Sequence, residues 1–78
     1  MIAFVRGKFA VKTPARVVVD VNGVGYELQI SLNTYAAIVN LENGQLNTYL
    51  HITENAQTLF GFADIAEKEL FLQLISVS

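Results

Sequence analysis

A chain of 78 residues, 53% of them apolar and 15% charged, has room for one hydrophobic core and is too apolar to be disordered. The absence of cysteine excludes disulfides and thiolate zinc sites, and no apolar run approaches the roughly 20 residues of a membrane-spanning helix. The net charge of −2 argues against purely nonspecific binding of nucleic acid. Arg6 and Lys8 interrupt the layout of a signal peptide, so we expect a cytoplasmic protein with no membrane partner. The high apolar fraction also predicts surface that is buried in an oligomer or against a following domain.

Three strands are predicted in the first half of the chain, at Ile2–Lys12, Arg16–Val21 and Val24–Ser31. Gly7 suggests a bulge or bend in the first strand, and Pro14 ends it because proline cannot donate to a ladder. The second strand is dense in β-branched valine. Asn22-Gly23 predicts a type I′ hairpin turn, since both central positions of that turn need a positive φ.

A short helix and two more strands are predicted next. Either Ser31 or Asn33 can cap a helical stretch that runs through Val39. Asn43-Gly44 indicates a second turn. The two strands follow at Gln45–Thr53 and Gln57–Phe62.

The end of the chain changes to a helical period. Asp64 followed by Glu67 fits a variant of the capping box, and a helix is expected from Asp64 to about Val77. Its apolar stripe comprises Leu70, Phe71, Leu74 and Ile75. No capping glycine follows, which leads us to expect that this helix begins a further domain.

The predicted order is three strands, a short helix, two strands and a terminal helix. This is the connection order of an OB-fold, so the expected fold class is an all-β barrel of five to six strands with one C-terminal α-helix. A closed barrel also removes most free strand edges, which suits so apolar a chain.

No catalytic constellation is found, so the chain is not expected to be an enzyme, and no cofactor or metal is expected. His51 has no companion at metal-ligand spacing and is interpreted as a partly exposed structural residue. Gly23-Val24-Gly25 sits in a hairpin with no helix after it, so the turn is favoured over a nucleotide loop. OB barrels often stack single-stranded bases on exposed aromatic rings, but most aromatics here fall on predicted core faces.

Charge is unevenly distributed along the chain. Four of the five cations lie in the first sixteen residues, at Arg6, Lys8, Lys12 and Arg16, and six of the seven carboxylates lie from Glu27 onward. The cations form either a basic edge that faces phosphate, with Arg6 and Lys8 as candidate contacts, or a solvated edge that protects the sheet. The pattern leaves both interpretations open.

Several runs in this chain resemble the N-terminal region of the RuvA family. They cover essentially the whole chain in order and comprise Met1-Ile2 with Arg6-Gly7, Gly23-Val24-Gly25-Tyr26-Glu27, Ile30-Ser31-Leu32-Asn33-Thr34-Tyr35, Gln57-Thr58-Leu59-Phe60-Gly61-Phe62, Lys68-Glu69-Leu70-Phe71 and Leu74-Ile75-Ser76-Val77-Ser78. The resemblance implies a DNA-binding subunit that acts in recombination and repair. Such a subunit binds four-way Holliday junction DNA as a homotetramer and loads the RuvB motor, which hydrolyses ATP, and the RuvC resolvase joins the complex.

The resemblance also implies a role for the last hairpin. In the family an acidic pin projects there and helps to separate DNA strands, and the matching positions are Glu54 and Asn55. The second carboxylate of the family is an amide here, so we expect a weaker repulsive pin.

The implied organisation is an OB-fold domain at residues 1–63 and, at 64–78, the first helix of a middle domain that is cut short. That middle domain carries the family's helix-hairpin-helix motifs, so residues 1–78 alone are expected to bind junctions very weakly. Two other functions stay open from the residues: an OB module for single strands or oligosaccharides, and an oligomerisation domain.

Overall fold

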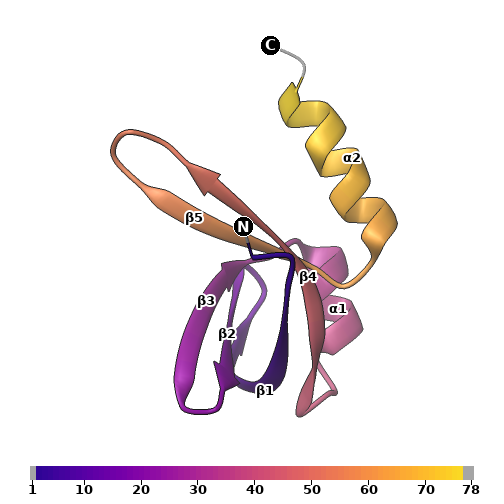
Figure 1. The fold of residues 1–78 in the computed structure, drawn as a ribbon. Helices are drawn as coiled ribbons and strands as arrows, with labels where there is room; N and C mark the ends of the chain where they lie inside the picture. Colours follow the sequence, from indigo (N-terminus) through magenta and orange to yellow (C-terminus); the bar gives the residue numbers. More distant parts are fainter. Residues whose placement is uncertain (1, 77–78) are drawn as a thin grey trace.

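The computed structural model describes residues 2–76, which form a five-stranded barrel with two helices (Figure 1). The strands are β1 (Phe4–Thr13), β2 (Arg16–Val21), β3 (Val24–Gln29), β4 (Asn43–Ile52) and β5 (Gln57–Phe62), and the helices are α1 (Leu32–Ile38) and α2 (Ile65–Ser76). The closed order β1-β2-β3-β5-β4, with α1 between β3 and β4, confirms the predicted OB-fold barrel. The predicted helix end at Val77 and the outer domain limits, Met1 and Ser78, lie outside the described residues.

The alternation of apolar residues along the strands fills the barrel. Val17 pairs with Leu28 and Val19 with Tyr26 in the β2–β3 ladder, so these four side chains point inward together. Leu46 joins them from β4, and Val17, Val19, Leu28 and Leu46 are fully buried. Burial of each such side chain stabilises the fold by about 1.5–3 kcal/mol.

β1 is long enough to pair with two neighbours. Residues 4–8 pair with β4 and residues 8–13 pair with β2. The register with β2 shifts between Phe9 and Val11, so the strand is irregular as predicted, but the shift does not lie at Gly7. A Cβ atom at Gly7 would overlap the carbonyl oxygen of Asp20, so the glycine permits a close approach of two backbones instead.

The tight turn between β2 and β3 has the predicted type I′ signature. Asn22 has a φ of 52° and Gly23 a φ of 90°, which are the two positive values that this turn requires. The Asp20 carboxylate accepts a hydrogen bond of 2.8 Å from the N–H of Gly23. The sequence therefore encodes this hairpin locally.

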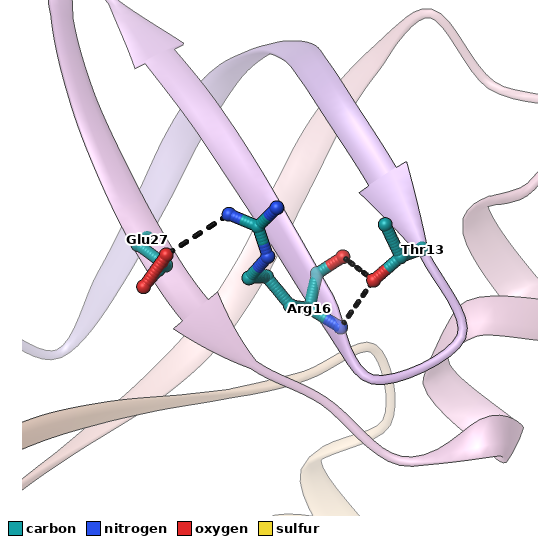
Figure 2. A network of polar contacts seen from close by, with 3 residues as sticks. All are labelled: Thr13, Arg16 and Glu27. Atoms are coloured by element: carbon teal, nitrogen blue, oxygen red, sulfur yellow. Dashed lines mark hydrogen bonds and ion pairs between the residues drawn. The ribbon is translucent and has the colours of Figure 1, made fainter.

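Thr13 and Arg16 close the turn between β1 and β2 (Figure 2). The Thr13 hydroxyl accepts from the N–H of Arg16 and donates to its carbonyl oxygen, both at 3.0 Å. The Arg16 guanidinium then reaches across to β3, where Nη1 lies 3.0 Å from Oε1 of Glu27. An exposed pair of this kind contributes about 0–1 kcal/mol, but it occupies one of the cations in the basic N-terminal segment.

Helix α1 is capped at both ends by side chains. Ser31, one of the two predicted caps, accepts a hydrogen bond from the N–H of Thr34. Lys12 donates from Nζ to the carbonyl oxygens of Val39 at 2.9 Å and Leu41 at 2.7 Å, just beyond the last turn. Lys12 is therefore committed to holding the helix against β1.

The predicted turn at Asn43-Gly44 is wrong. Both residues belong to β4, where Asn43 pairs with Lys8 and Gly44 with Gly7. The chain reverses earlier, over residues 40–42, where the N–H of Leu41 donates to the carbonyl oxygen of Ile38. Pairing with β1 overrides the local preference of this dipeptide for a turn.

Candidate nucleic-acid interface

The β4–β5 hairpin extends beyond the barrel as a two-stranded ribbon (Figure 1). β1 pairs with β4 only as far as Asn47, and β3 meets β5 at a single pair, Gln29 with Phe60. Farther along, β4 and β5 pair only with each other, through three successive pairs that end with Ile52 and Gln57. The ribbon projects because its neighbours in the barrel stop short of it.

Glu54 and Asn55 occupy the tip of this ribbon, and both are exposed. Thr53 closes the turn: its N–H donates to the carbonyl oxygen of Ala56 at 2.8 Å, and its hydroxyl accepts from the N–H of Ala56 at 3.1 Å. The same hydroxyl lies 3.2 Å from the Ala56 carbonyl oxygen and donates to it. The two residues between are thus held outward by a short closed turn, with the carboxylate and the amide free to meet a ligand.

The charge at the tip belongs to Glu54 alone. No other Asp, Glu, Lys or Arg occurs between positions 49 and 60. A single carboxylate in water repels a phosphate weakly, so any effect of this group depends on close approach and on repetition in several copies.

Arg6 and Lys8, the candidate phosphate contacts, lie elsewhere. Arg6 pairs with Gln45 in the β1–β4 ladder, and its guanidinium donates two hydrogen bonds, of 2.9 and 2.7 Å, to Oε1 of Gln45. It also lies 5.7 Å from the ring centroid of Phe4. Gln45 and Glu54 are nine positions apart in the sequence, which is about 30 Å of extended chain, so the structure does not bring these cations to the tip. They form a separate surface at the far end of the strand.

The outer face of β2 and β3 is poorly suited to single strands. The residues of this face alternate with the buried residues. They include two carboxylates, Asp20 and Glu27, one cation, Arg16, which is paired with Glu27, and no aromatic ring. Single-strand sites on OB barrels combine cations with exposed rings. This surface therefore does not favour the single-strand alternative.

An aromatic cluster at the root of the hairpin was not anticipated from the sequence as a group. Phe71 of α2 lies 5.0 Å from Phe60, 5.3 Å from Phe62 and 5.9 Å from Tyr49, measured between ring centroids. His51 continues the cluster toward the tip, 6.2 Å from Tyr49, and it is exposed. The alternation of rings in β4 and β5 is the sequence signal from which the cluster could have been predicted. Only the fold shows that α2 packs on these rings.

The rest of α2 follows the predicted helix in part. Asp64 caps its start by accepting a hydrogen bond of 2.9 Å from the N–H of Ala66. Of the predicted apolar stripe, Phe71 packs on the hairpin, whereas Leu70 and Leu74 are 56% and 67% exposed. Among the described residues no helix is long and apolar enough to cross a membrane, and no cluster of three or more His, Cys, Asp or Glu that could hold a metal ion occurs.

A closed five-stranded barrel with a helix between its third and fourth strands defines an OB-fold protein. Residues 1–61 match the family described as the RuvA N terminal domain. The chain belongs to this family, as its quoted sequence runs predicted.

Curated relatives agree over the full chain. It is 54% identical over 78 residues to the Holliday junction branch migration complex subunit RuvA of Cytophaga hutchinsonii, covering 100% of this chain and 39% of the relative. The protein of the same name from Bacteroides thetaiotaomicron is 55% identical over 78 residues, again with 100% and 39% covered. That from Geotalea daltonii is 48% identical over 81 residues, with 100% and 40% covered. The chain spans about two fifths of the length of the curated relatives it matches.

Proposed function

We propose that this chain is the N-terminal part of a non-catalytic, cytoplasmic subunit of a Holliday junction branch migration complex. The observation that carries the proposal is the projecting hairpin with Glu54 and Asn55 exposed at its tip, in a chain of the RuvA N terminal domain family. In this proposal the whole protein binds four-way junction DNA as a homotetramer, loads the RuvB motor and works with the RuvC resolvase. The names of the relatives support one part of this proposal, which is membership of a branch migration complex.

The tip would act on DNA by repulsion. At about 6 Å a carboxylate and a phosphate repel by roughly 0.7 kcal/mol in water, and by more where water is excluded. A tetramer would bring one Glu54 from each subunit to the crossover, and the repulsions would add. Asn55 would contribute hydrogen bonds to DNA groups in place of a second charge.

Residues 1–63 would form the barrel domain, and residues 64–78 would open the domain that follows it. The exposed apolar side chains of α2, chiefly Leu70 and Leu74, support this division because they could pack against a following domain. Arg6 and Lys8 remain candidate phosphate contacts at the far end of β4. Arg6 would have to exchange its hydrogen bonds with Gln45 for a phosphate.

The test is a charge reversal at the tip. Residues 1–78 replace the matching part of the Cytophaga hutchinsonii relative, and branch migration of a four-way junction is timed with and without Glu54→Lys. Reversal turns a repulsion of about 0.7 kcal/mol into an attraction of similar size, so each phosphate contact should hold DNA roughly tenfold longer and branch migration should slow.

The matched control is Glu69→Lys, which makes the same charge change at an exposed residue of α2, outside the hairpin and away from Arg6 and Lys8 in the sequence. The control should leave the rate unchanged. An unchanged rate with Glu54→Lys would favour the oligomerisation alternative instead, since a pure scaffold has no use for the tip charge.

A further inference from the structure

Glu67 makes a polar contact between α2 and the start of α1. Its Oε1 accepts a hydrogen bond of 2.8 Å from the hydroxyl of Thr34, and its Oε2 accepts one of 2.9 Å from the hydroxyl of Ser31. The Ser31 hydroxyl also lies 3.1 Å from Oε1. The expected capping-box partner of Asp64 thus reaches across to the start of α1 instead.

The hydroxyls that hold Glu67 are themselves fixed. Thr34 is 1% exposed, and its hydroxyl accepts a hydrogen bond of 3.1 Å from the N–H of Ala63, just before α2. The Ser31 hydroxyl accepts from the N–H of Thr34 as the cap of α1. Each hydroxyl therefore both donates and accepts, and the network ties the first turn of α2 to the buried Thr34 of α1.

One helical turn farther along α2, Phe71 packs on the root of the projecting hairpin. Glu67 and Phe71 are four residues apart, so they lie on the same face of the helix. The rings of Tyr49, Phe60 and Phe62 lie within 5.9 Å of the Phe71 ring. Hydrogen bonds to a carboxylate are short and directional, so the two hydroxyls restrict the orientation of the helix turn from which Phe71 projects.

We propose that Glu67 is a positioning residue that fixes the direction in which α2 leaves the barrel and so places Phe71 under the hairpin that carries Glu54 and Asn55. A free two-stranded ribbon is marginally stable in water, and α2 gives this one a third element to pack against. The functional consequence of this positioning rests on the proposed function of the tip. The positioning of α2 by Glu67 does not rest on it, because it concerns only contacts within the chain.

The test measures the distance between the ribbon and α2 in the 78-residue chain. The chain has no cysteine, so spin labels at Gln57→Cys and Leu74→Cys report one distance distribution by pulsed electron paramagnetic resonance. Both positions are exposed. The parent should give a single narrow peak. Glu67→Ala should broaden and shift it, and Glu67→Gln should restore it, because an amide oxygen accepts the same hydroxyl hydrogens.

Glu69→Ala, at an exposed glutamate on the same helix, is the matched control and should leave the peak unchanged. An amide spectrum of the barrel strands confirms that each variant is folded. If Glu67→Ala does not fold, Glu67→Asp tests the same point, since a side chain one methylene shorter cannot reach both hydroxyls. A parent-like peak in Glu67→Ala or Glu67→Asp, or equal broadening in Glu69→Ala, would overturn the proposal. None of these results depends on DNA, so a failure of the proposed function leaves the measurement intact.

Discussion

Two lysines four residues apart on β1 have different surroundings. Lys12 is half-buried and donates to two carbonyl oxygens beyond α1, whereas Lys8 is exposed and makes no hydrogen bond or ion pair with a described residue. Lys12→Met should therefore lower the free energy of unfolding by about 1–2 kcal/mol, because two charge-assisted hydrogen bonds are lost. Lys8→Met should stay within about 0.5 kcal/mol of the parent. Urea denaturation of both variants measures the difference.

Equal losses of unfolding free energy in the two variants would contradict this assignment. They would mean that Lys12 is only a solvated surface residue. The distinction matters for the open question of the basic segment. Lys12 is bonded to two carbonyl oxygens, Arg16 is paired with Glu27, and Arg6 is bonded to Gln45. Of these four cations, Lys8 is therefore the most available to an outside phosphate.

At the scale of elements, the Thr53 hydroxyl makes two of the three hydrogen bonds that close the tip turn. Thr53→Val keeps the shape of the side chain but removes the acceptor for the N–H of Ala56 and the donor to its carbonyl oxygen. The amide of Ala56 should then exchange with solvent about five- to thirtyfold faster, which corresponds to roughly 1–2 kcal/mol of lost protection. Thr58→Val, in the same ribbon, is the control. Unchanged exchange at Ala56 would mean that the backbone alone holds the turn.

The sequence predicted those elements whose determinants are local. Asn22-Gly23 adopts its turn because the two residues carry the required φ values themselves, and Ser31 caps α1 through its own hydroxyl. Asn43-Gly44 misled because its partners are Gly7 and Lys8, more than thirty positions away. The exposed tip was correctly placed from the hairpin pattern, but the path of Glu67 to Ser31 and Thr34 was not, since it joins two helices whose separation in space no local pattern records.

At the scale of the whole molecule, the barrel is closed unevenly. β1–β2, β1–β4, β2–β3 and β4–β5 are each joined by five or six residue pairs, whereas β3 and β5 meet in parallel at the single pair Gln29 with Phe60. Side-chain packing compensates there: Gly61 lies so close to Leu28 that an added Cβ would be 3.3 Å from its side chain. The seam between β3 and β5 is closed by apolar contact but has few backbone hydrogen bonds. It should therefore open more easily than the other strand junctions.

We therefore predict that the barrel opens first between β3 and β5. Amides at this seam, at residue 29 and residues 60–61, should exchange through local opening, with little dependence on added denaturant. Amides of Val17 and Val19, in the middle of the β2 ladders, should exchange only on global unfolding and show the full denaturant slope. Native-state hydrogen exchange in a urea series measures both. A common steep slope at the seam and in β2 would mean that packing at Gly61 makes the barrel a single cooperative unit. A shallow slope at the seam alone would mark β5, with the hairpin that it anchors, as the element most free to move relative to the rest of the barrel.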